Sequence, residues 1–139
     1  MSEVPESLKP GLTHETTTRV EARHLASWWG SGLADVLATP VLVALCEDCA
    51  WRLAQPFLGD GQQTVGTHVD IRHLAATPPG MAVTVRAELI AVEGRRLRFR
   101  VEAWDEVERV AEGEHERFVI DVARFLRRVE EKAGRAGAT

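Results

Sequence analysis

A long apolar segment, followed by four segments of alternating polar and apolar residues, limits this chain to a few architectures. Segment 40–57, PVLVALCEDCAWRLAQPF, has the length of a helix and is apolar on every side over its first turns. We therefore expect a helix that is buried in the core. Thr39 followed by Pro40 is the expected order of an N-cap residue and a first-turn proline.

The segments after this helix have the two-residue period of strands that bury one face. They cover 65–73, 81–94, 95–106 and 107–122, and turn residues separate them at 78–80, 93–94 and 105–106. These spacings favour hairpins over crossovers, and the charged second face favours an antiparallel sheet packed on one side. We expect an α+β fold: about five strands wrapped around one long central helix, a first strand near 12–20, short helices before the long one, and a C-terminal helix.

Length and composition narrow the class of protein. At 139 residues the chain is expected to form a single domain, 1–139. The net charge of −4, with acids and bases interspersed, argues against a nucleic-acid-binding protein. Without a signal-like N-terminus or an apolar run long enough for a membrane span, we expect a soluble, cytoplasmic protein that binds no membrane. Because the histidines and acids lack ligand spacing, no metal or other cofactor is expected.

A carboxylate and an imidazole are expected to meet inside this fold. Glu47 lies in the apolar helix, where an unpaired charge is costly. On strand 65–73, His73 shares one face with Val69 and Ile71, and this apolar face is predicted to point inward. Thr39 precedes Glu47 by eight residues, a little over two helical turns. We therefore expect the hydroxyl, the acid and the histidine to line one groove.

Several of these residues also have structural explanations. As an N-cap, Thr39 would stabilise the helix by about 1 kcal/mol without touching a substrate. An inward histidine such as His73 is often a hydrogen-bonded core residue. Either Glu47 or the adjacent Asp48 can simply face water. Cys46 and Cys49 have the CxxC spacing of redox and metal sites, but no second pair accompanies them. In a buried helix, thiols behave as small apolar groups, so we interpret both cysteines as structural.

Five motifs carry a resemblance to a known family: LATPVLVALCEDCAWRLA, GTHVDIRHLAATPPG, VTVRAEL, VEGRRL and GEHERFVI. Over about the last hundred residues they resemble the fluoroacetyl-CoA thioesterase family of hotdog-fold proteins. The resemblance implies a homodimer with two sheets side by side, and higher homo-oligomers are common in such families. It also implies catalytic roles for Thr39, Glu47 and His73, and it places Gly66 beside the acyl group.

The expected function is hydrolysis of an acyl-CoA to a free acid and coenzyme A. In one version Thr39 attacks the thioester; in the other, Glu47 or His73 activates water and Thr39 holds the substrate. Two other functions stay open. One is non-catalytic acyl-CoA binding. The other, ranked lower, is a hydratase or dehydratase reaction, because relatives with that activity carry a histidine on or near the central helix, which is absent here.

The remaining candidates concern substrate contacts. Arg117 shares a face of the last strand with Gly113 and His115, and from there His115 and Arg117 can reach either the site or the dimer seam. We expect Arg117 to contact the substrate. Segment 24–39 departs from the phenylalanine-bearing lid of the fluoroacetate-specific enzyme and contains Trp28 and Trp29, interpreted as another lid or as packing at the groove mouth. We therefore leave fluoroacetyl unassigned as the substrate and expect a small or medium acyl group. Coenzyme A is anionic and therefore needs a basic patch. One candidate is the row of Arg96, Arg98 and Arg100, and the other is the stripe of Arg124, Arg127, Arg128 and Lys132. Each is more simply explained as a solvated face.

Overall fold

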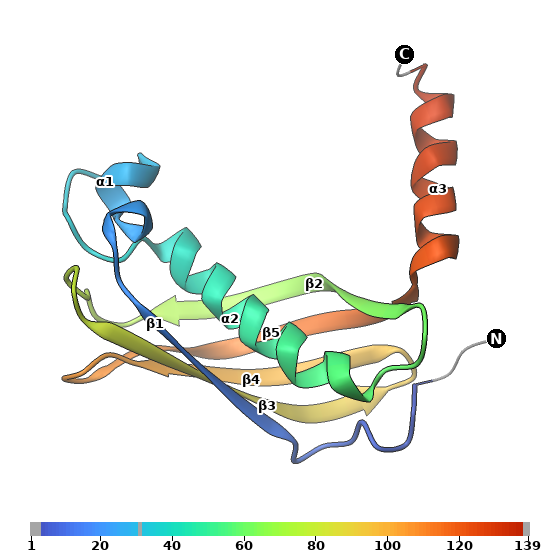
Figure 1. The fold of residues 1–139 in the computed structure, drawn as a ribbon, viewed down its shortest axis with the longest axis horizontal. Coiled ribbons are helices and arrows are strands. Elements are labelled where there is room, and N and C mark those ends of the chain that lie inside the picture. The colour runs from blue at the N-terminus through green and yellow to red at the C-terminus, as the bar shows by residue number, and fades with distance from the viewer. Residues whose placement is uncertain (1–3, 31, 138–139) are drawn as a thin grey trace.

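One long helix lies across one face of an antiparallel sheet (Figure 1). The computed structural model describes residues 4–30 and 32–137. Within them the strands, in the spatial order β1-β3-β4-β5-β2, are β1 (Thr13–Arg19), β2 (Gln62–His73), β3 (Ala82–Glu93), β4 (Arg96–Trp104) and β5 (Arg109–Asp121). The helices are η1 (Ala22–His24), α1 (Ala26–Trp29), α2 (Thr39–Ala54), η2 (Gln55–Phe57) and α3 (Val122–Arg135). The sheet around one long helix, predicted from the sequence, is confirmed.

The apolar face of α2 holds the helix on the sheet. It buries Val41, Leu42, Cys46, Cys49, Ala50, Leu53 and Ala54. These positions recur every three or four residues, as on one face of a helix. The opposite side is open, because Ala44 and Asp48 are exposed. The expectation of a helix buried on every side is therefore wrong: the sheet covers α2 from one direction only.

The central strands β3 and β4 supply most of the surface under α2. Their fully buried side chains alternate along each strand and are Val83, Val85, Ala87, Leu89, Leu97, Phe99, Val101 and Ala103. Burying a side chain of the size of valine, leucine or phenylalanine contributes about 1.5–3 kcal/mol, so this face dominates the stability of the fold. The predicted one-sided packing is confirmed.

Strand β2 forms an edge of the sheet and is only partly covered. Its register with β5 shifts between Gly66 and His68, which leaves Thr67 as the extra residue of a bulge. Ile71 and His73 are half-buried, whereas Thr67 and Val69 are exposed, Val69 to 41%. The prediction of one continuous buried face is therefore wrong for the middle of this strand, at Thr67 and Val69.

Helix α3 leaves the sheet at the end of β5 and projects away from it (Figure 1). None of its described residues is buried, and Phe125, Leu126 and Val129 are exposed apolar side chains on it. No helix in ranges 4–30 and 32–137 combines the length and the apolar composition needed to cross a membrane.

The close approach of β2 to β5 at Gly113 can be tested by adding a methyl group. A Cβ at Gly113 would lie 2.1 Å from the carbonyl oxygen of Asp70 and 2.7 Å from the Cα of Ile71. We expect Gly113→Ala to lower the free energy of unfolding by about 1–3 kcal/mol, because the edge strand has to shift. Urea unfolding measures this change. The control is Gly134→Ala on α3, where a Cβ meets nothing within 4 Å. An unchanged Gly113 variant would contradict the close approach.

Candidate active site

A threonine hydroxyl and a histidine from distant parts of the chain form a direct contact. Thr39 is the first residue of α2, and Oγ1 of Thr39 lies 2.7 Å from Nδ1 of His73 near the end of β2. The N-cap of α2 is Ala38, not Thr39 as the sequence predicted, and no side chain caps the helix. The hydroxyl therefore faces the imidazole instead of the helix backbone.

The state of His73 suits a base. The side chain is half-buried, and burial lowers the pKa of His73, an effect that outweighs the opposing influence of the Ala75 carbonyl. Its Nε2 atom is shielded from solvent and forms no hydrogen bond within the described part of the chain. A neutral imidazole beside a hydroxyl can accept its proton and so activate it as a nucleophile.

Glu47 does not join this pair within one protomer. Eight helical residues separate it from Thr39 by about 12 Å along the axis of α2 and by about 80° around it. In the described part of the chain, Glu47 forms no hydrogen bond or ion pair with His73, so the expected meeting of these two side chains is wrong for the isolated protomer. The adjacent Asp48 is exposed and pairs with Arg52 at 2.8 Å.

The carboxylate of Glu47 instead faces Gly66 on β2. A Cβ built on Gly66 would lie 3.1 Å from Oε2 of Glu47, and the next nearest atoms, at 3.3 and 3.4 Å, belong to His115 and Arg117. The missing side chain therefore leaves space between a carboxylate and a guanidinium. Even a Cβ at this position would press on the neighbouring atoms, so glycine alone keeps the position open between the two charged groups.

A buried hydrogen-bond network fixes this guanidinium. Nε of Arg117 donates to Oγ1 of Thr64 at 2.7 Å, and Nη2 donates to the Thr64 carbonyl at 3.1 Å. Nη1 of Arg117 lies 3.1 Å from Nε2 of His115, and Nδ1 of His115 lies 2.8 Å from the carbonyl oxygen of His68. Because a carbonyl only accepts and a guanidinium only donates, His115 is the neutral Nδ1–H tautomer.

Electrostatics agree with this assignment. Burial, assisted by the Arg117 cation, lowers the pKa of His115, although the His68 carbonyl and Glu47 oppose the shift. Burial also lowers the pKa of Arg117, and the negative charge of Glu47 acts against that change. Glu47 therefore supplies the compensating charge for a cation that is only 7% exposed.

The two tryptophans before α2 line a hollow at its first turn. Trp28 and Trp29 are 68% and 56% exposed, and they face a cavity of about 320 Å³ together with Pro40, Val41 and Ala44. Nε1 of Trp29 donates to the carbonyl of Arg23 at 2.7 Å, which fixes the position of that ring. The structure thus places both tryptophans beside the first turn of α2.

The cysteines have the structural character predicted for them. Both are free and buried in α2. Burial, with help from nearby Cys49 and Glu47, raises the pKa of Cys46 to about 12, and burial also raises the pKa of Cys49. Neither thiol can be an effective nucleophile at neutral pH.

Comparison with known proteins extends this geometry to a family. The family model described as fluoroacetyl-CoA-specific thioesterase (FlK) matches residues 20–123. This chain belongs to that family. The chain is 46% identical over 98 residues to the fluoroacetyl-CoA thioesterase of Streptantibioticus cattleyicolor, which covers 70% of each protein.

Solved structures of FlK-family and related proteins have the same hotdog fold. A crystal structure of the fluoroacetyl-CoA thioesterase FlK superposes with a TM-score of 0.85 at 36% identity, covering 90% of this chain and 97% of that one. A hypothetical Thermus thermophilus protein, described as a thioesterase superfamily member, gives a TM-score of 0.87 at 28% identity over the full length of both chains. The hotdog fold expected from the sequence is thus confirmed.

The candidate residues of this FlK-family protein therefore fall into two clusters. The first is Thr39 with His73, and the second is Glu47 with Gly66, Arg117 and the supporting residues His115 and Thr64. From the sequence, His115 was expected to reach the site or the dimer seam, but it was not counted among the site residues. The available signal was its place between Gly113 and Arg117 on an inward face, where a polar residue needs a partner.

The neutral state of His115 predicts a loss of stability in acid. Because the pKa of His115 is lowered in the folded chain, the unfolded chain binds the proton first as the pH falls. The free energy of unfolding should therefore decrease below about pH 6.5, the ordinary pKa of histidine. We expect His115→Gln, which does not titrate and keeps an acceptor for Arg117, to reduce this decrease. Urea unfolding between pH 5 and 7.5 measures the slope.

The matched variant for this test is His115→Asn. Asparagine does not titrate either, but its shorter side chain cannot reach Arg117, so it should lower stability at every pH by about 1–3 kcal/mol. Equal pH slopes for wild type and both variants would contradict the buried neutral state of His115.

Proposed function

We propose that this protein hydrolyses acyl-CoA thioesters to a free acid and coenzyme A. The observation that carries the proposal is the 2.7 Å contact between Thr39 Oγ1 and His73 Nδ1, in a member of a thioesterase family. The relative from Streptantibioticus cattleyicolor is named for the same class of substrate, an acyl-CoA. Family membership and a hydroxyl beside a base together favour acyl transfer over binding alone.

In the proposed reaction, Oγ1 of Thr39 attacks the carbonyl carbon of the thioester and its proton passes to Nδ1 of His73. The carbon–sulfur bond then breaks, the proton moves to sulfur, and coenzyme A leaves while the acyl group remains as an ester on Thr39. His73 next takes a proton from water, whose oxygen attacks the ester. The acid is released and Thr39 regains its proton.

The first turn of α2 offers stabilisation for the oxyanion. Negative charge develops on the carbonyl oxygen during attack, and fixed backbone N–H groups stabilise such charge. The first N–H groups of a helix have no partner inside it, so the N–H of Val41 is available next to Thr39. Pro40 has no N–H to contribute. This reaction needs water but no metal or prosthetic group, and we propose that the protein uses neither.

The surroundings of Thr39 favour a small or medium apolar acyl group. The hollow at the start of α2 is lined mainly by apolar groups of Trp28, Trp29, Pro40, Val41 and Ala44, with Arg23 and His24 as its polar members. Fluoroacetyl is not assigned, because the segment before α2 carries this tryptophan pair in place of the family's phenylalanine-bearing lid. Two free cysteines favour the reducing cytoplasm as the location of the protein.

We also propose a homodimer formed through the edge of β2. The outer edge of this strand has no neighbour among the described residues, and the residues from Gly66 to Asp70 are all exposed. An exposed edge with an apolar residue such as Val69 is a template for pairing with a second strand. Antiparallel pairing of β2 with its own copy forms a closed twofold dimer with one continuous sheet.

Such pairing would complete the site. If the twofold axis passes through Asp70, His73 lies opposite the bulge at Gly66 of the partner subunit. The Thr39–His73 cluster then meets the cluster around Glu47 of the partner subunit, and the thioester lies between them. In this arrangement Glu47 acts across the dimer interface, where it orients the attacking group or takes a proton from it. Arg117 contacts the substrate.

The activity is tested by coenzyme A release from short, branched, aryl and long acyl-CoAs. We expect turnover of one acyl class, and we expect His73→Ala and Glu47→Gln to lower kcat/KM by about 100-fold or more, since each removes a group that moves or orients a proton. Asp48→Asn is the matched control, because Asp48 is the exposed neighbour of Glu47 and pairs with Arg52. A burst of coenzyme A that Thr39→Ala abolishes marks the acyl-enzyme, whereas its absence favours direct attack by water.

Other outcomes of this assay select the other functions. Tight binding of an acyl-CoA without release of coenzyme A would favour a non-catalytic binding protein. Addition or removal of water across the acyl chain would favour a hydratase or dehydratase. The two buried thiols contribute little to a thiol-reagent assay, because the pKa of each is raised.

The composite site predicts complementation between inactive variants. Random mixing of Thr39→Ala and Glu47→Gln subunits should restore about a quarter of the sites, because one of the two sites in each mixed dimer then has every wild-type group. Mixing Thr39→Ala with His73→Ala should restore none, since these residues come from the same subunit. Activity is measured after co-refolding, and gel filtration reports the dimer. No recovery in the first mixture would exclude a site shared between subunits.

A further inference from the structure

A cavity between the end of β5 and α3 lies apart from both catalytic clusters. Its volume is about 240 Å³. The apolar part of its lining comes from Phe118, Val119, Ile120 and Phe125. Its charged rim comes from Arg95, Arg124, Arg128 and the carboxylate of Asp121. We call it the α3 cavity. An apolar pocket with a few charged groups at its rim has the composition of a small-molecule site.

The arginines that α3 contributes to this rim have uncompensated charge. Arg124 and Arg128 form no ion pair within residues 4–30 and 32–137, whereas Arg95 is held by Asp121 at 3.4 Å. Helix α3 carries five basic and two acidic side chains, although the chain as a whole has a net charge of −4. The α3 cavity therefore offers positive charge to a ligand.

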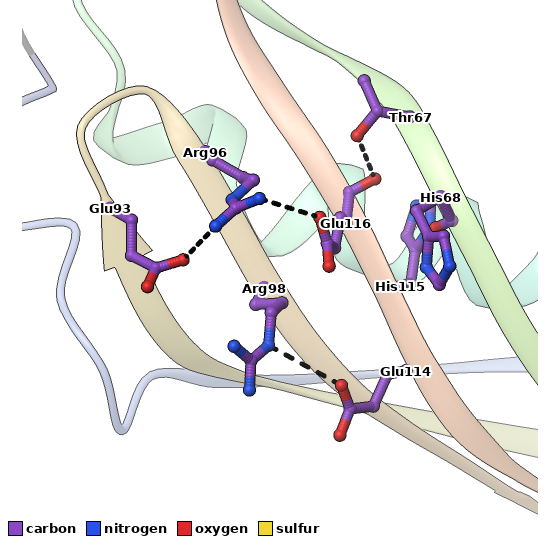
Figure 2. Close-up of polar contacts among 8 residues, drawn as sticks. All are labelled: Thr67, His68, Glu93, Arg96, Arg98, Glu114, His115 and Glu116. Atoms are coloured by element: carbon purple, nitrogen blue, oxygen red, sulfur yellow. Dashed lines mark hydrogen bonds and ion pairs between the residues drawn. The ribbon is translucent and has the colours of Figure 1, made fainter.

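Two of the three arginines in the other basic row are already neutralised. On the outer face of β4, Arg96 contacts Glu93 at 2.7 Å and Glu116 at 3.9 Å, and Arg98 contacts Glu114 at 3.6 Å (Figure 2). Arg100 forms no ion pair within the described ranges, but it lines a hollow together with the carboxylates of Asp70, Glu112 and Glu114. Of the two basic patches found in the sequence, the stripe on α3 is therefore the better suited to an anionic ligand.

We propose that the α3 cavity binds the phosphorylated adenosine end of coenzyme A. This inference rests on the proposed function, which makes an acyl-CoA the substrate. Purines stack on aromatic rings, for which Phe118 and Phe125 are available. Arginine forms paired hydrogen bonds with phosphate, for which Arg124 and Arg128 are available. A simple anion would make no stacking contact with Phe118 and Phe125.

The position of the cavity allows one substrate to reach both places. Phe118 directly follows Arg117 on β5, so the two side chains point to opposite faces of the same part of the sheet. The N–H of Val122 donates to the carbonyl of Gly61 at 2.9 Å, which places the base of α3 beside the start of β2. Gly66 lies five residues further along, about 17 Å of strand. The extended phosphopantetheine arm can bridge this distance around the corner of the sheet.

Binding of adenosine 3′,5′-bisphosphate to the full chain tests the site directly. Calorimetry should show affinity for wild type that falls about tenfold or more in the double variant Arg124→Ala/Arg128→Ala. The control is Arg127→Ala, which removes an equal charge from the same helix outside the cavity. Because α3 is exposed, these changes leave the core intact, and circular dichroism verifies the helix. Equal affinity in wild type and the double variant, or equal loss in the control, would overturn the proposal.

Kinetics provide a second readout. The double variant should raise KM for an acyl-CoA about tenfold and leave KM unchanged for the matching N-acetylcysteamine thioester, which lacks the nucleotide. Equal effects on both thioesters would exclude a nucleotide site. Inorganic phosphate that displaces the bisphosphate at equal concentration would instead identify a simple anion site and also overturn the proposal. If wild type cleaves neither thioester, the proposed function fails, and nucleotide binding still decides the assignment of the cavity.

Discussion

The burial of α2 against a single face of the sheet is the constraint on which the rest of the structure depends. Leu42, Cys46 and Ala50 lie on the covered side and have no solvent exposure. This contact fixes the rotation of the helix, and thereby sets Thr39 toward the end of β2 and Glu47 toward Gly66. A helix turned by one residue, about 100°, would place neither side chain at its present partner.

The architecture was predictable because its signal repeats along the chain. Val83, Val85 and Ala87 alternate with polar residues, and a two-residue period identifies a strand with one buried face without knowledge of its neighbours. The bulge at Thr67 has no such signal, because one extra residue arises from the fit between β2 and β5. The exposure of Val69 follows from the edge position of β2, which no local pattern encodes.

The candidate site was predictable in its residues but not in its pairings. A Thr-Pro step suits a threonine at the N-cap or at the first helical position, and this difference of one residue decides whether the hydroxyl serves the helix or His73. Glu47 illustrates the same limit. Sequence identified a carboxylate that needs compensation, but its neighbour Arg117 lies seventy residues away and is reached only through the folded sheet.

The packing of the two cysteines has a chemical consequence for a protein that handles coenzyme A. Disulfide exchange requires a thiolate that can reach the other sulfur. Cys46 and Cys49 are fully buried under the sheet, and the pKa of Cys46 is raised to about 12. The folded chain therefore resists forming mixed disulfides with small thiols, including any that its own reaction would generate. The same side chains that complete the apolar core thus keep the protein inert toward its product.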